Sequence, residues 1–160
     1  MIAVRYGALA ALAVWLGSTS VLGLLIPPTM ARALPADPSV VAEVDAVFDE
    51  LFRLFHLLSY ACGVVVLVSL LVIKFVGPPP ASFKVRAALV SLMLAVAVYS
   101  GLPLNRKIRD VQSTVKGPVG ALPESDPRRA RLDRLHRIDM TLMSVNMALG
   151  VVLLYWYVRE

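Results

Sequence analysis

Two histidines, the only ones in this 160-residue chain, are the side chains best suited to hold a cofactor or a metal. His56 and His136 each lie at the start of a long apolar run, at similar depth and on the same side of a membrane. An ionisable group at that depth is costly to leave unpaired in lipid, so both are candidates for function. Three interpretations of the pair are open.

The first interpretation is structural. Both imidazoles anchor their helices at the membrane surface, hydrogen-bonded to neighbouring helices or to headgroups. Groups this close to the interface lose little solvation, so the arrangement needs no bound ligand.

The second interpretation is a b-type haem held between two helices of a bundle, with His56 and His136 as axial ligands. Three cationic side chains near the histidines could pair with the haem propionates. They are Arg53, Arg134 and Arg137. A protein of this kind would transfer electrons.

The third interpretation is a soft-metal site on one helix. Four residues follow one another at i, i+4, i+7 and i+11, which places them on one line of a helix: His136, Met140, Met143 and Met147. Imidazole and thioether ligands suit Cu(I). Methionine is also a common apolar gap-filler, so the same stripe fits simple helix packing.

Four long apolar runs must hold these residues. The chain is 58% hydrophobic and only 17% charged, against about 25% charged residues in a soluble globular protein. The runs are continuous rather than alternating, and each approaches the roughly 17–25 residues that cross a bilayer as a helix. They cover residues 8–26, 57–75, 87–103 and 140–158, and the third either ends at residues 100–103 or continues past Pro103 with a kink. The sequence therefore predicts an all-α fold, an integral membrane four-helix bundle forming one domain over residues 1–160.

The chain also repeats itself. Residues 24–27 (Leu-Leu-Ile-Pro) are echoed by residues 100–103 (Ser-Gly-Leu-Pro), and His56 is echoed by His136. The pattern indicates a tandem duplication of a two-helix unit, with a pseudo-twofold axis along the membrane normal. Asp126-Pro127 opens the last helix with a capping residue before a proline, and residues 105–126 are expected to form a loop.

The chain has a net charge of +5, and its positive residues are unequally divided between the two sides of the predicted membrane. Eleven of the sixteen Lys and Arg residues belong to the two loops on the histidine side. The positive-inside rule places those loops in the cytoplasm and both termini outside. We therefore expect a multi-pass protein of the bacterial inner (plasma) membrane. Its expected partner is the lipid bilayer, and we expect it to bind no nucleic acid.

The small and polar residues within the runs predict helix packing rather than catalysis. Gly17, Gly23 and Gly63 would allow close helix approach, and Ser100 and the membrane serines would add interhelical hydrogen bonds. Asp139 could orient an imidazole or pair with Arg137, but the sequence favours it as a charge at a helix terminus near the interface. No Ser-His-Asp order, paired membrane carboxylates or phosphate loop is recognisable. These features predict a non-enzymatic binding or accessory subunit, forming a homo-oligomer or joining a larger membrane complex.

Several segments together resemble a known family. Residues 15–18 and the run to Pro27-Pro28, residues 51–55, residues 134–137 and residues 146–150 are similar to the bacterial relatives of transmembrane protein 205. The resemblance implies a four-helix integral membrane protein with an undefined biochemical role. The animal protein is associated with resistance to platinum drugs, and copper-resistance membrane proteins are its distant kin, so the resemblance favours soft-metal handling. The chain departs from the family pattern after His136, at residues 137–139.

Overall fold

Helices make up the regular structure of the protein, which confirms the all-α membrane bundle. The computed structural model describes residues 2–26, 38–76, 82–115, 123 and 125–159, and no strand occurs within these ranges. The α-helices are α1 (Ile2–Ser20), α3 (Pro38–Val76), α4 (Phe83–Tyr99), α5 (Asn105–Ser113) and α6 (Pro127–Val158). Two π-helices, η1 (Val21–Leu25) and η2 (Ser100–Leu104), follow α1 and α4.

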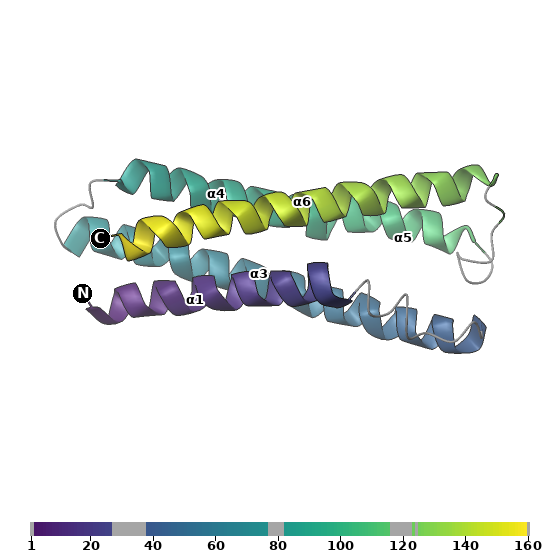
Figure 1. The fold of residues 1–160 in the computed structure, drawn as a ribbon, viewed down its shortest axis with the longest axis horizontal. Helices are drawn as coiled ribbons and strands as arrows, with labels where there is room; N and C mark the ends of the chain where they lie inside the picture. The colour runs from purple at the N-terminus through teal and green to yellow at the C-terminus, as the bar shows by residue number, and fades with distance from the viewer. Residues whose placement is uncertain (1, 27–37, 77–81, 116–122, 124, 160) are drawn as a thin grey trace.

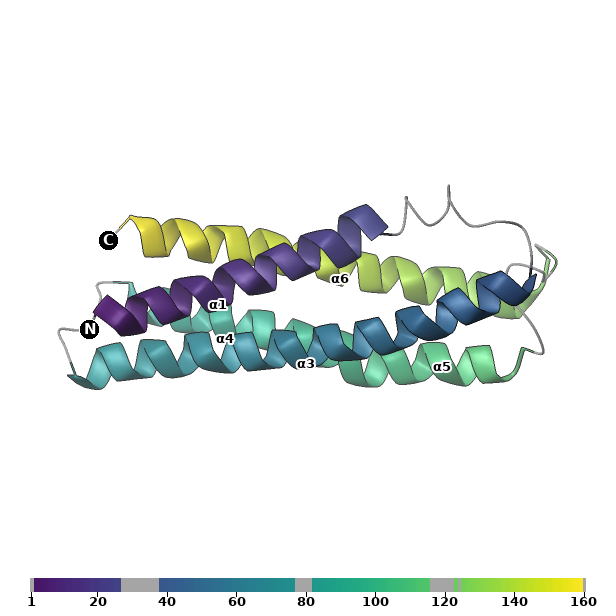
Figure 2. The same ribbon diagram turned by 90° about the horizontal axis from the view of Figure 1, so that it is seen from below.

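The long helices lie side by side in a four-membered ring. α1 packs against α3 and α6, and α4 packs against the same two helices. Both chain termini lie at one end of the bundle, and the start of α3, the start of α6 and all of α5 lie at the other (Figure 1 and Figure 2). The second of these ends carries both histidine-side segments that the sequence predicts.

Four helical stretches are long and apolar enough to cross a membrane. They are Ile2–Gly23, Ala46–Val76, Phe83–Ser113 and Pro127–Val158. The expected loop from residue 105 is wrong over its first part, because the third stretch continues through η2 and α5 to residue 113. Ile108 and Val111 of α5 pack against Leu132 of α6, and this apolar contact keeps the segment helical.

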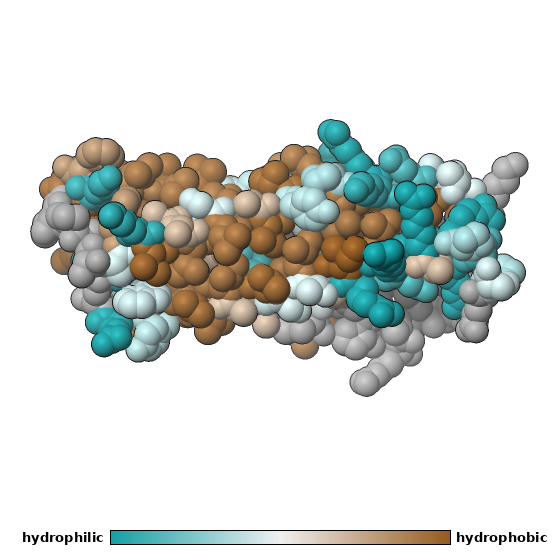
Figure 3. Space-filling model, turned by 90° about the horizontal axis from the view of Figure 1, so that it is seen from above, coloured by the Kyte–Doolittle hydropathy of each residue, from teal (hydrophilic) through white to brown (hydrophobic). Residues whose placement is uncertain are grey.

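The surface divides the bundle into an apolar part and a polar end. Hydrophilic side chains gather over the end formed by α5 and the first turns of α6 (Figure 3). α3 has 39 residues, a length of about 58 Å at 1.5 Å per residue. The hydrocarbon core of a bilayer is only about 30 Å thick. The start of α3 is therefore the water-facing extension of a membrane helix.

The centre of the bundle is apolar and closely packed. Leu12, Trp15, Leu70 and Met93 are each at most 1% exposed. A Cβ atom added to Gly63 would lie 2.5 Å from Cδ2 of Leu94. Gly63 therefore allows the close helix approach that the sequence predicts.

Two other glycines show that this prediction holds only in part. A Cβ on Gly150 would lie 3.1 Å from Cε of Met93 and would also meet Leu16, so α6 too approaches its neighbours through a glycine. A Cβ on Gly17 would meet nothing within 4 Å. Gly17 is exposed and does not serve packing within the chain.

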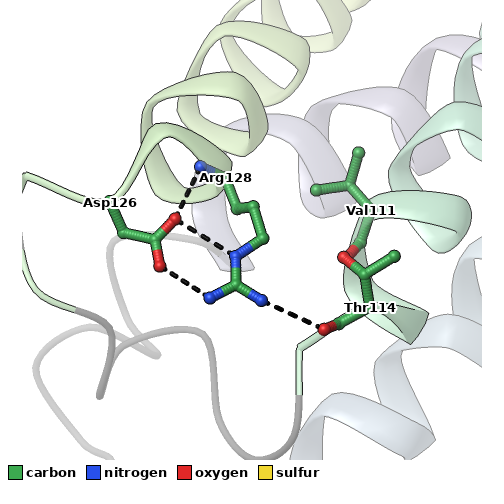
Figure 4. Close-up of polar contacts among 4 residues, drawn as sticks. All are labelled: Val111, Thr114, Asp126 and Arg128. Carbon is green, nitrogen blue, oxygen red and sulfur yellow. Dashed lines mark hydrogen bonds and ion pairs between the residues drawn. The ribbon is translucent and has the colours of Figure 1, made fainter.

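The predicted cap of α6 is present and connects α6 to α5 (Figure 4). The backbone N–H of Arg128 donates to Oδ1 of Asp126 over 2.8 Å, with Pro127 at the first helical position. The Arg128 guanidinium donates to Oδ2 of Asp126 over 2.8 Å and to the Thr114 carbonyl over 3.1 Å. These hydrogen bonds from Arg128 hold the pKa of Asp126 below its usual range.

Candidate functional site

A hydrogen-bonded cluster joins three helices inside the bundle. It consists of His56 on α3, Ser100 on η2 and Asp139 on α6, and we call it the polar centre. Nε2 of His56 lies 3.5 Å from Oγ of Ser100, and the Ser100 hydroxyl donates to Oδ1 of Asp139. Nδ1 of His56 lies 2.7 Å from the carbonyl oxygen of Phe52. Since His56 and Ser100 are only 8% and 6% exposed, one buried hydroxyl connects an imidazole to a carboxylate.

A break in the third membrane helix positions Ser100. The five residues of η2 form a π-helix with Pro103 inside it. Proline has no N–H to donate, so it cannot continue the regular hydrogen-bond ladder of α4. A π-helical turn holds more residues than an α-helical one, and such turns frequently mark functional sites. The break turns Ser100 towards α3 and α6 while Ile108 of α5 still packs on α6.

Gly101 allows this break to lie directly against α3. A Cβ atom at position 101 would lie 2.9 Å from Cγ of His56 and would also meet the Tyr60 hydroxyl. The Tyr60 hydroxyl itself donates to the carbonyl of Ala97 over 3.4 Å. The imidazole of His56 therefore lies between its own helix and the backbone of Gly101, which has no side chain to displace the ring.

The internal repeat has a partial counterpart in the structure. η1 ends at Leu25, two residues before the sequence position of Pro27, and η2 contains Pro103. Both copies thus form a π-helix beside the repeated proline. The two histidines are not equivalent, because His56 is buried and His136 is exposed.

The residues expected to hold a haem lie in different surroundings. Both ring nitrogens of His56 lie beside protein oxygens in the polar centre. An axial ligand needs an unoccupied ring nitrogen, so His56 would have to leave Ser100 before it bound iron. The other expected contacts are exposed side chains: His136, Arg134 and Arg137 on α6 and Arg53 on α3. The haem assignment stays a prediction.

The methionine stripe of α6 is divided between the surface and the core. Met140 is 40% exposed, whereas Met143 is buried, with its sulfur 3.5 Å from a Cβ placed on Gly23. The sulfur of Met147 accepts a hydrogen bond from the Ser20 hydroxyl over 3.4 Å. The two deeper thioethers therefore fill space against α1 and η1.

This packing leaves the copper assignment a prediction. Among the residues that the structure describes, no three His, Cys, Asp or Glu side chains come together as metal ligands. Cys62 is buried in the core cluster that also contains Trp15, and burial of this kind favours an inert thiol.

Asp139 has a role that the sequence does not favour. It points into the bundle and accepts a hydrogen bond from Ser100, whereas the sequence favours a charge at the interface. Two features of the sequence point towards this role. Asp139 lies three residues after His136, and residues 100–103 form a Ser-Gly-x-Pro segment. Neither feature specifies which helix faces which.

Arg86 is a second buried polar residue, at the end that carries the termini. It is 4% exposed, its Nη2 donates to the carbonyl of Trp156 over 2.6 Å, and its Nε donates to Oγ of Ser82 over 3.0 Å. Its guanidinium lies 4.9 Å from the ring centre of Tyr157. The charge therefore lies beside the C-terminal end of α6, where the helix dipole favours a cation, and it ties α4 to α6.

Comparison with known proteins supports a family but no activity. No curated protein and no solved structure matches the chain significantly. The likeness to relatives of transmembrane protein 205 stays a resemblance. The model of a family described as a domain of unknown function matches residues 10–116, well over half of the chain, including His56 and Ser100. The chain therefore belongs to the family called domain of unknown function DUF4149.

Proposed function

We propose that this protein is a non-enzymatic membrane protein, a binding or accessory subunit, whose polar centre binds one proton. The observation that supports this is the continuous line of hydrogen bonds from the Phe52 carbonyl through His56 and Ser100 to Asp139. The number of hydrogens that this line can hold follows from the chemistry of its members.

One hydrogen of the line is fixed by the backbone. The Phe52 carbonyl can only accept, so Nδ1 of His56 carries a hydrogen. When the Ser100 hydroxyl donates to Asp139, its oxygen can accept a second hydrogen from Nε2, and the imidazole is then a cation beside a carboxylate. When Ser100 donates to Nε2 instead, the imidazole is neutral. Asp139 is then protonated and donates its hydrogen to the Ser100 oxygen. Both arrangements hold one proton more than a neutral imidazole with an ionised carboxylate.

Loss of that proton leaves the line incomplete. The single hydroxyl hydrogen of Ser100 cannot serve both Nε2 of His56 and the carboxylate of Asp139. A buried polar group without its hydrogen bond costs about 1–3 kcal/mol. The loaded centre is neutral overall, whereas the unloaded centre carries one uncompensated negative charge. The line of hydrogen bonds is therefore complete only in the loaded state, and Ser100 offers a path along which the proton moves between His56 and Asp139.

The described titratable side chains in contact with His56 or Ser100 are Tyr60 on α3 and Asp139 on α6. η2 contributes no acid or base between residues 100 and 104. From α1 and η1, the residues packed near the Phe55 side of this region are the apolar Leu22 and Ile26. Asp139 is therefore the ionisable side chain that the Ser100 hydroxyl connects to His56.

The order of the three residues distinguishes this centre from a hydrolase triad. In such a triad the histidine lies between serine and carboxylate and activates the serine as a nucleophile. Here the serine lies in the middle, and the second nitrogen of the imidazole bonds the backbone of Phe52. The arrangement suits transfer of a proton rather than attack by Ser100.

Infrared difference spectroscopy across a pH step tests the proposal. The protein carries His136→Gln and isotope-labelled histidine, so the imidazole bands report His56 alone. We expect one step in which the imidazole and carboxyl bands change together. Asp139→Asn should alter the imidazole step, and the matched control Asp133→Asn, an exposed carboxylate on the same helix, should not. An imidazole step that is identical with and without Asp139 would contradict a shared proton.

The accessory-subunit part of the proposal rests on the outer face of α1. Gly17 is exposed there and nothing lies within 4 Å of a Cβ placed on it, so a second helix can approach closely. We expect the purified protein to self-associate in mild detergent and Gly17→Leu to reduce that association. A wild-type protein that stays monomeric at all concentrations in sedimentation would contradict self-association.

A further inference from the structure

We infer that the outer face of α6 binds the headgroup of an anionic phospholipid. A groove of about 740 Å³ runs along this face, and its lining includes Asp133, Arg134, Arg137, Ile138 and Leu142. At 100° per residue, Arg134 and Arg137 lie about 140–160° around the helix from Asp139. The two arginines thus lie on the other side of α6 from the polar centre, and lipid binding by them does not depend on the proton proposed there.

The order of side chains along the groove matches the order of groups in a phospholipid. Ala130 and Asp133 lie farthest from the membrane-spanning part of α6, Arg134 and Arg137 follow, and Ile138, Thr141 and Leu142 lie nearest to it. Arg137 and Arg134 precede the apolar run at residues 140–158 by distances of about 4 Å and 9 Å at 1.5 Å per residue. The headgroup layer on one side of a bilayer is roughly 5–7 Å thick. Both guanidinium groups can therefore reach the level of the lipid phosphates while the apolar wall meets the acyl chains.

The charge of the groove selects an anionic lipid. Two guanidinium groups face one carboxylate, that of Asp133, so the lining has a net positive charge. Neither Arg134 nor Arg137 forms an ion pair with another residue in the described part of the chain. A guanidinium pair can bind a phosphodiester through several hydrogen bonds at once. A lipid with one net negative charge, such as phosphatidylglycerol, neutralises the lining, whereas a zwitterionic lipid does not.

Lipid retention measured by native mass spectrometry tests this site. The full chain is reconstituted in nanodiscs of mixed phosphatidylglycerol and phosphatidylcholine and then released. We expect the wild type to retain phosphatidylglycerol preferentially and Arg134→Gln with Arg137→Gln to lose that preference by roughly tenfold or more. The matched control is Arg106→Gln with Lys107→Gln, two exposed cations of α5 at the same end that do not line the groove.

Each alternative result has a definite meaning. Unchanged lipid preference in the Arg134/Arg137 double variant would overturn the proposal. Equal losses in both double variants would also overturn it, because the preference would then come from the basic end as a whole. Inorganic phosphate that displaces the retained lipid at millimolar concentration would show that the ligand is a free anion. Because all four exchanged side chains are exposed, unchanged thermal unfolding is expected to show that the variants fold.

Discussion

At the scale of single residues, the polar centre depends on the small size of Gly101 as much as on its polar side chains. Gly101 leaves room for His56 and Tyr60, and Ser100 beside it supplies the one hydroxyl that both His56 and Asp139 contact. The sequence identified His56 because it holds only two histidines. It could not identify Asp139 as a partner, because the rotation of α6 relative to α3 is set by packing and not by spacing.

Gly101→Ala is predicted to disturb the centre. The new methyl group would overlap the His56 ring and the Tyr60 hydroxyl, and overpacking of this kind costs about 1–3 kcal/mol. We expect a lower midpoint of thermal unfolding and a shifted ring resonance of His56. Gly7→Ala is the control, since a Cβ there meets open space and should change neither quantity. Equal effects of the two substitutions would contradict the described packing of Gly101.

At the scale of elements, the sequence predicts straight segments better than breaks. Long apolar runs fix the existence of the membrane helices, and the Asp126-Pro127 pair fixes the start of α6. A kinked continuation of the third run past Pro103 was one of two alternatives, but its extent to residue 113 was not predicted, because α5 is polar by composition and is held by Ile108 and Val111 against α6. The π-helical form of η2 was missed as well, since a proline predicts a kink without specifying which residue it turns inwards.

The cap of α6 predicts a local dependence on pH. The pKa of Asp126 is lowered by hydrogen bonds from Arg128, so the carboxylate stabilises the helix start above the usual aspartate pKa of about 3.9. This stabilisation is lost as the pH falls through the lowered value. We expect the backbone amide resonance of Arg128 to move with that transition in NMR spectra. Asp126→Asn keeps a capping side chain that does not titrate, so its Arg128 amide should show no such step.

At the scale of the whole molecule, the bundle has one apolar part and one polar end, with the polar centre on three different helices between them. Composition alone predicts this architecture, because four runs of suitable length and sparse charge leave little alternative. The family to which the chain belongs is described as a domain of unknown function, and its model matches residues 10–116. Haem and copper binding stay predictions of the sequence.

Sidedness can be tested with cysteine variants in a Cys62→Ala background. Positively charged residues crowd the polar end, so we expect it to face the cytoplasm. Ser113→Cys lies at that end and Lys84→Cys lies at the opposite end, and both positions are exposed. A membrane-impermeant maleimide should label Lys84→Cys in right-side-out vesicles and Ser113→Cys only after lysis. The reverse labelling pattern would contradict the orientation.

The proton itself can be counted. Potentiometric titration of the purified protein in detergent compares the wild type with the double variant His56→Gln and Asp139→Asn, so that all other titrating groups cancel. His56 and Asp139 together exchange two protons between acid and base, so we predict that the wild type takes up about two protons more than the double variant across the whole titration. Because the two groups share one of these protons, the differences caused by the two single variants should not add up to the difference caused by the double variant. Single-variant differences that do add up to the double-variant difference would contradict a proton shared in the polar centre.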